Sequence, residues 1–188
     1  MSTPSPSRRK FLKATTSAFA FPTIIPATAI GKGGRPAPSE RVTVGLFGFG
    51  TIAQATTPGF LADERVQVVA VADPATELTH YGYSGELTGG RDVAKAYVEK
   101  FYGERKDRAE GFKGCTAYED YRELLEKEDI DALNISTPDH WHAKMCLAGA
   151  ARGKHMYGQK PLALTVKQGR LMSDAVAKAG VTWQTGSQ

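Results

Sequence analysis

Cysteine is scarce in this sequence, with two among 188 residues. Two cysteines cannot build a disulfide-rich scaffold or a zinc site with four thiolate ligands. We expect Cys115 and Cys146 to be separate thiols, with a disulfide between them as the less favoured alternative. His140 and His142 could pair on a metal, but no cluster of Cys, Asp or Glu completes a ligand set, so no metal is expected.

Acidic side chains are missing from residues 1–29, which hold four basic ones, Arg8, Arg9, Lys10 and Lys13. The whole chain carries a formal net charge of +4. Without residues 1–29, basic and acidic side chains are equal in number. A nucleic-acid-binding domain normally concentrates positive charge in its folded part. The sequence therefore argues against a nucleic-acid partner.

A long apolar run is missing as well. Residues 14–30 are only mildly apolar, and Pro22, Pro26 and several Ser and Thr interrupt them. A membrane-spanning helix needs about 20 predominantly apolar residues, so no stable membrane anchor is expected. Basic residues, a short apolar stretch and small residues at 27–29 are instead typical of a signal peptide.

The basic part of this segment, residues 7–13 with the sequence SRRKFLK, resembles a twin-arginine (Tat) export signal. The resemblance implies a Tat signal peptide over residues 1–29, recognition by the Tat machinery and export to the periplasm. Residues 30–40 are rich in Gly and Pro and are expected to form a flexible linker. The competing interpretation is a basic tail that contains two adjacent arginines by chance.

Short apolar runs alternate with segments of helical spacing over residues 41–188. The predicted strands are 41–47, 66–72, 131–136, 155–157 and 181–184. The predicted helices are 51–62, 92–102, 118–127, 140–151 and 165–179, and Pro58 should kink or shorten the first of them. Strands separated by helices pair in parallel through right-handed crossovers. The pattern thus predicts one α/β domain with a doubly wound parallel sheet.

A glycine-rich turn follows the first predicted strand and opens the first helix. Its sequence fits the dinucleotide-binding pattern G-x-G-x-x-A at residues 48–53. Gly48 would permit the tight turn, Gly50 would let the backbone approach a diphosphate, and Ala53 would allow close helix packing. The free N–H groups at the helix start would hold the diphosphate. The predicted cofactor contacts here are Gly48, Phe49, Gly50, Thr51 and Ile52.

Asp73 ends the second predicted strand, about 20 residues beyond the turn, where such domains place a ribose-binding acid. Its carboxylate would accept hydrogen bonds from ribose hydroxyls and repel a 2′-phosphate, which favours NAD and leaves NADP as the alternative. A purely structural role for Asp73 before Pro74 is the competing interpretation. Residues 74–91 are expected to cover the adenosine end, with Arg91 against adenine or phosphate, or to form a solvated loop.

Two further motifs follow later strands. Ser136, Thr137, Pro138 and His142 belong to the sequence STPDHWH, and residues 158–161 are GQKP. Open α/β sheets bind ligands at the carboxyl ends of their strands. These residues are therefore predicted to line the same site, although His142 could be a structural residue at a helix start and Lys160 an ordinary solvated lysine.

The glycine-rich turn, Asp73, the T-P-x-x-x-H element and residues 159–161 together resemble the glucose–fructose oxidoreductase / inositol dehydrogenase (Gfo/Idh/MocA) family. The resemblance covers residues 41–188. It implies a Rossmann fold and hydride transfer between a nicotinamide cofactor and a sugar or cyclitol. It also implies that Lys160 lies near the nicotinamide as the catalytic residue, and that Pro161 shapes the turn, with a cis bond as one option. Gln159 departs from the family's usual glutamate, which removes a charge partner for Lys160.

The resemblance also implies a second, substrate-binding domain, which residues 41–188 do not supply. We therefore expect the chain to be the cofactor domain of a larger enzyme. The alternative is a non-catalytic dinucleotide-binding module, or an inactive fragment without its substrate domain. Both interpretations predict NAD binding, and turnover distinguishes them.

Overall fold

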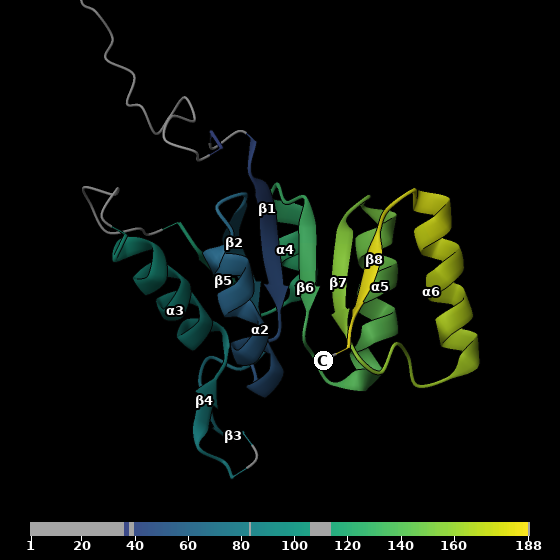
Figure 1. Ribbon diagram of the computed structural model, residues 1–188. Helices are drawn as coiled ribbons and strands as arrows, with labels where there is room; N and C mark the ends of the chain where they lie inside the picture. Colours follow the sequence, from purple (N-terminus) through teal and green to yellow (C-terminus); the bar gives the residue numbers. More distant parts are fainter. Residues whose placement is uncertain (1–35, 38–39, 83, 106–113, 188) are drawn as a thin grey trace, which may run out of the picture.

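The computed structural model describes residues 36–37, 40–82, 84–105 and 114–187 (Figure 1). The predicted signal peptide, residues 1–29, and most of the predicted linker lie outside these residues. The described chain forms a parallel sheet flanked by helices, as the alternation of strands and helices predicts.

The sheet has six strands in the order β5-β2-β1-β6-β7-β8, and every neighbouring pair is parallel. The chain runs outward from β1 in one direction and then returns to β6 on its other side. This reversal makes the gap beyond the carboxyl ends of β1 and β6 the place where such sheets bind ligands. The strands are β1 Val42–Phe47, β2 Val66–Ala72, β5 Thr116–Tyr118, β6 Ala132–Ile135, β7 His155–Gln159 and β8 Trp183–Gly186.

Helices cover both faces of the sheet (Figure 1). Leu46, Val71 and Leu61 belong to the buried cluster beneath α2 and α3. Phe47, Ile135 and Met156 belong to the cluster beneath α4 and α5, and α6 packs against α5. The adjacent residues Leu46 and Phe47 therefore pack into the hydrophobic clusters on opposite faces of the sheet. Because β1 is buried on both faces, its sequence is a continuous apolar run. The helices are α2 Thr51–Ala62, α3 Arg91–Gly103, α4 Tyr121–Lys127, α5 His142–Ala151 and α6 Val166–Ala179.

Three short strands were not predicted from the sequence. Residues 78–81 (β3, Leu78–Tyr81) and 87–89 (β4, Leu87–Gly89) pair as an antiparallel hairpin within the segment predicted as a loop. Tyr118 ends β5 and does not begin a helix, because Thr116–Tyr118 pair with the end of β2. Three and four residues are too few to show a period, so only tertiary pairing identifies these strands.

Pro58 does not shorten the first helix, and that part of the prediction is wrong. Helix α2 runs through the proline to Ala62. Ala53, Thr57 and Leu61 are buried on both sides of the proline along the helix. Their packing against the sheet outweighs the cost of one lost backbone hydrogen bond.

Residues 139–141 form a short 3-10 helix, so α5 starts at His142 and not at His140.

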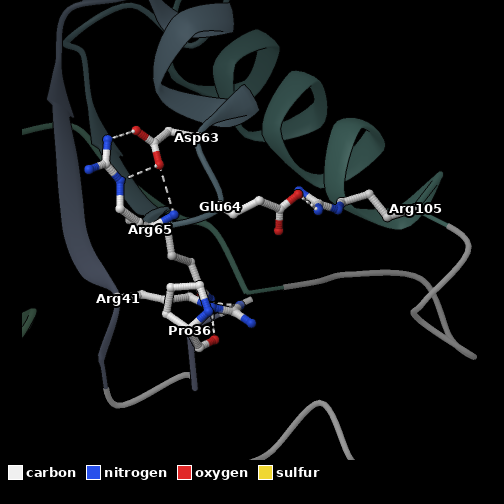
Figure 2. A network of polar contacts seen from close by, with 7 residues as sticks. Pro36, Arg41, Asp63, Glu64, Arg65 and Arg105 are labelled. Carbon is white, nitrogen blue, oxygen red and sulfur yellow. Dashed lines mark hydrogen bonds and ion pairs between the residues drawn. The ribbon is translucent and has the colours of Figure 1, made fainter. Parts of the chain in front are cut away.

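A polar network lies where β1 and β2 begin, at the edge of the sheet opposite to their carboxyl ends (Figure 2). Arg65 forms an ion pair with Asp63 at 2.7 Å, and Arg105 pairs with Glu64. The hydrogen bond from the Arg65 side chain lowers the pKa of Asp63 to about 2. Because the Arg65 side chain is largely exposed, its ion pair with Asp63 contributes little to stability.

Both cysteines are buried free thiols, as predicted. Cys115 lies in the cluster beneath α3, and Cys146 lies in the cluster beneath α5, on the other face of the sheet.

Within the described part of the chain, no helix combines the length and apolar character needed to cross a bilayer. The same residues contain no group of three His, Cys, Asp or Glu side chains placed to hold a metal ion.

Candidate functional site

A cavity of about 390 Å³ opens at the carboxyl ends of β1, β2 and β6. Three separate parts of the chain supply most of its wall: the turn after β1, the residues after β2 and the residues after β6. Tyr81 of β3, segments around α4 and the start of α5 complete it. The lining residues are Gly48, Phe49, Gly50, Ala72, Asp73, Pro74, Tyr81, Glu119, Asp120, Tyr121, Arg122, Ser136, Thr137, Pro138, Trp141 and Met145.

The glycine-rich turn passes close to the end of β6. Gly48 has a φ of +81°, and a Cβ at this position would lie 2.9 Å from the carbonyl oxygen of Ser136. Both the backbone conformation and the close approach therefore require glycine here. The Gly48 N–H donates to the carbonyl of Ala72 at 2.8 Å. The tight turn predicted from the sequence thus draws the ends of β1, β2 and β6 together around the cavity.

Helix α2 has no side-chain cap, and its N-cap residue lines the cavity, whereas the predicted contacts Thr51 and Ile52 are not among the lining residues. Gly50 is the N-cap residue, and the first turn contains no acidic side chain. Among the described residues, no hydrogen bond engages the N–H groups of Gly50, Thr51 or Ile52. Unpaired N–H groups and the positive end of the helix dipole attract anions. These residues therefore fit a diphosphate group, which would supply the missing acceptors.

Asp73 is 5% exposed and lies beside this helix start. Its Oδ2 accepts a hydrogen bond from Phe49 N at 2.9 Å, and its Oδ1 accepts one from Ala75 N at 2.9 Å. The carboxylate thus orients the glycine-rich turn and also lines the cavity. Each carboxylate oxygen has a second lone pair, so the structural role leaves acceptors for a ligand hydroxyl.

Arg91 does not project freely toward the cavity. Its guanidinium Nη1 donates to the carbonyl oxygens of Asp73 at 3.2 Å and Pro74 at 2.7 Å, and Nη2 pairs with Glu119 at 3.5 Å. These contacts fasten the start of α3 to the end of β2. The alternative that residues 74–91 form a solvated loop is wrong, because the segment contains the paired strands β3 and β4 and Arg91 begins α3.

His142 lies behind the cavity wall and is fully buried. Its Nδ1 lies 2.7 Å from the carbonyl oxygen of Pro161, and its Nε2 lies 2.9 Å from that of Thr137. One side chain therefore connects the loop after β6 with the loop after β7. A neutral imidazole can donate to one of these carbonyls, and an imidazolium can donate to both.

Ser136, Thr137 and Pro138 line the cavity, whereas Lys160 does not. The peptide bond between Lys160 and Pro161 is cis, and the Lys160 side chain is exposed at the carboxyl end of β7. The preceding side chain, that of Gln159, is buried and only 3% exposed. Neither atom of its amide group has a hydrogen-bond partner among the described residues. The side chain at position 159 is thus buried while its neighbour faces solvent.

Comparison with known proteins places this geometry in a family. Residues 82–187 match the model of the GFO_IDH_MocA oxidoreductase family, described as an oxidoreductase family with an NAD-binding Rossmann fold. The chain belongs to this family. The family's fold agrees with the six-stranded sheet, and the domain is an NAD-binding Rossmann domain.

Curated relatives include a protein from Shewanella sp. named glycosyl hydrolase family 109 protein 1. It is 32% identical over 148 residues, which cover 77% of this chain and 28% of the relative. Levoglucosan dehydrogenase from Pseudarthrobacter phenanthrenivorans is 41% identical over 66 residues, covering 35% of this chain and 16% of that enzyme. The chain therefore spans less than a third of the length of these relatives.

Solved structures share the fold. An NAD-binding oxidoreductase from Klebsiella pneumoniae is 28% identical with a TM-score of 0.56, and the match covers 78% of this chain and 34% of that one. The WlbA dehydrogenase from Bordetella pertussis, solved with NADH and UDP-GlcNAcA, gives a TM-score of 0.60 at 20% identity over 78% of this chain and 37% of that one. The second likeness supports the fold only.

Sequence reasoning missed several residues of the cavity wall. Tyr81, Glu119, Tyr121 and Met145 line it. Each lies on an element whose position depends on tertiary packing, and none belongs to a motif with a fixed spacing from the glycine-rich turn. Only the glycines at positions 82, 85, 89 and 90 indicated that the segment around Tyr81 turns sharply.

Proposed function

We propose that this chain is the cofactor domain of an oxidoreductase that transfers a hydride between a nicotinamide cofactor and a hydroxyl or ketone of a sugar or cyclitol. The uncapped start of α2 beside the glycine-rich turn is the observation that carries the proposal. It supplies unpaired donors and a positive dipole end where the sheet reverses direction. Membership of an NAD-binding oxidoreductase family supports the same cofactor.

The proposed substrate class follows the names of the relatives. One curated relative is a levoglucosan dehydrogenase, and one structural neighbour is a scyllo-inositol dehydrogenase solved with NAD(H) and scyllo-inositol. Both names describe polyhydroxylated rings. The substrate site of this protein would lie beyond the carboxyl ends of β6 and β7, next to the nicotinamide end of the cofactor.

Lys160 is the residue we propose for catalysis. It follows β7 at the carboxyl edge of the sheet and its side chain is exposed. An ammonium group at this edge can donate a proton to a ketone oxygen, or stabilise the alkoxide formed from a hydroxyl, while the nicotinamide supplies or receives the hydride. Thr137 and Pro138 would form the adjoining wall of the cofactor site.

A second candidate function is cleavage of a glycosidic bond at an NAD-containing site. The alignment with the Shewanella glycosyl hydrolase, over 77% of this chain, favours it. Some glycoside hydrolases depend on NAD. The two candidates share the cofactor site and differ in their products. A reaction that releases a free sugar without net change in NADH would favour hydrolysis, and stoichiometric NADH formation would favour dehydrogenation.

Asp73 is expected to set the preference for NADH over NADPH. Replacing it by asparagine removes the charge that repels a 2′-phosphate and weakens the contact with the ribose. We expect Asp73→Asn to reduce the ratio of NADPH to NADH dissociation constants by about tenfold. Fluorescence titration of the full chain with each cofactor measures this ratio.

Asp139→Asn is the matched control, because Asp139 is exposed and does not line the cavity. It should leave the ratio unchanged. An unchanged ratio in Asp73→Asn itself would show that this carboxylate orients the glycine-rich turn without selecting the cofactor.

We also propose that residues 1–29 direct export through the Tat machinery to the periplasm. The motif SRRKFLK supports this proposal. Replacing both Arg8 and Arg9 by lysine keeps the charge and should retain the protein in the cytoplasm of a Tat-competent bacterium, since the twin arginines are the recognised feature. Cell fractionation and immunoblotting measure the distribution. Lys32→Arg, outside the motif, should be exported normally. Equal export of the twin-lysine variant would contradict the proposal.

A further inference from the structure

The hairpin of β3 and β4 is attached to the glycine-rich turn and the start of α2. Gly82 N donates to Thr51 Oγ1 at 2.7 Å. Gln54 Nε2 donates to the carbonyl of Thr88 at 2.9 Å, and Gly90 N donates to that of Phe49 at 3.2 Å. Figure 1 shows the hairpin projecting beyond the carboxyl ends of the strands. The hairpin is thus fixed next to the proposed diphosphate site.

The ring of Tyr81, the last residue of β3, fits between two glycines. A Cβ added at Gly50 would lie 2.9 Å from Tyr81 Cε1, and one added at Gly89 would lie 2.8 Å from Tyr81 Cδ2. Any larger residue at either position would displace the ring. The second glycine of the turn is therefore required by an aromatic wall of the cavity.

The hydroxyl of Tyr81 is available to a ligand. The residue lines the cavity together with Gly50 and Asp73. Among the described residues, no hydrogen bond engages the Tyr81 hydroxyl. Burial, followed by the nearby Asp73 carboxylate, raises the pKa of Tyr81. The phenol therefore stays protonated at neutral pH and can donate a hydrogen bond.

Asp73 and Tyr81 offer complementary groups to one ligand. The carboxylate of Asp73 can only accept, whereas the Tyr81 phenol can donate. A hydroxyl group that donates to Asp73 can accept from Tyr81 at the same time. By the general arrangement of these sheets, the adenosine ribose lies beside the acid at the end of the second strand. The ribose therefore supplies a hydroxyl at the required place.

We propose that Tyr81 is a cofactor-binding residue, whose hydroxyl donates to the adenosine ribose and whose ring covers the cavity over Gly50. The assignment rests on the proposed function, because it requires a nicotinamide dinucleotide in this cavity. It gives the β3–β4 hairpin a role in holding the adenosine half of the cofactor.

The test compares Tyr81→Phe with the wild-type full chain in titrations with NADH and with ADP, which contains the same ribose and diphosphate. The variant keeps the ring between Gly50 and Gly89 and removes only the hydroxyl. We expect the dissociation constants of NADH and ADP to rise by the same factor, about five- to tenfold. Tyr97→Phe is the matched control, since Tyr97 is an aromatic neighbour of Phe49 that does not line the cavity. It should bind both ligands as the wild type does.

The outcomes separate this proposal from the proposed function. If the wild-type chain binds both ligands and Tyr81→Phe binds them equally well, the proposed role of Tyr81 is wrong, whereas the proposed function as a cofactor domain still stands. Equal weakening by Tyr97→Phe would also overturn it. A loss confined to NADH would place the contact outside the adenosine half and contradict the assignment. If the wild-type chain binds neither ligand, the proposed function itself fails.

Discussion

Replacing Gly50 by valine is expected to weaken NADH binding by about a hundredfold or more, which corresponds to roughly 3 kcal/mol. A Cβ at this position would lie 2.9 Å from the ring of Tyr81. The branched side chain would therefore displace the Tyr81 ring and the hairpin that carries it, beside the helix start where the diphosphate is proposed to bind. Lys160→Ala should keep the wild-type affinity within about twofold, because Lys160 does not line the cavity.

Gly59→Val controls for the general effect of a branched residue in α2. A Cβ at Gly59 meets no atom within 4 Å, and this residue is exposed on the same helix. It should bind NADH normally. Fluorescence titration compares the three variants. If Gly50→Val and Lys160→Ala weakened binding to the same extent, the division between a cofactor-holding turn and a catalytic lysine would be wrong.

His142→Ala is expected to lower the free energy of unfolding by about 3 kcal/mol. The imidazole is fully buried between the carbonyl oxygens of Thr137 and Pro161. Alanine removes the ring N–H that can donate to these carbonyls and creates a cavity at the start of α5. The loss should appear as a lower midpoint in urea unfolding, with an unchanged dependence of the free energy on urea concentration.

His140→Ala is the control for this second prediction. His140 is exposed two residues earlier, so its removal should change the free energy of unfolding by no more than about 0.5 kcal/mol. His142→Gln retains an amide donor and should recover part of the lost stability. An alanine variant as stable as the wild type would show that the two loops are held together by other contacts.

The sequence predicted the framework of the site because that framework depends on local patterns. A strand buried on both faces is a continuous apolar run, and the turn after it needs glycine where φ is positive, as at Gly48. Asp73 could be identified by its distance from this turn and its place at the end of a strand. These features are defined by local residue patterns or by a fixed spacing along the chain.

The rest of the site depends on contacts between distant segments. Tyr81 reaches the cavity only because two short strands pair and two glycines accommodate its ring. No periodic pattern in residues 74–91 indicates that pairing. The sequence also left open whether His142 lines the cofactor site or supports the structure. Its ring contacts the carbonyl of Thr137, in the loop after β6, and that of Pro161, in the loop after β7. The local sequence around His142 does not indicate where the loop after β7 lies, so the second contact could not be predicted.

The most direct test of the account is a calorimetric titration of the full chain with NADH, which requires no substrate. We predict saturable binding at one site per chain, with a dissociation constant in the micromolar range. Gly50→Val should weaken this binding by about a hundredfold or more, and Gly59→Val should leave it unchanged. The absence of saturable binding to the folded wild-type chain at NADH concentrations up to about 1 mM would contradict the assignment of the cavity as a cofactor site.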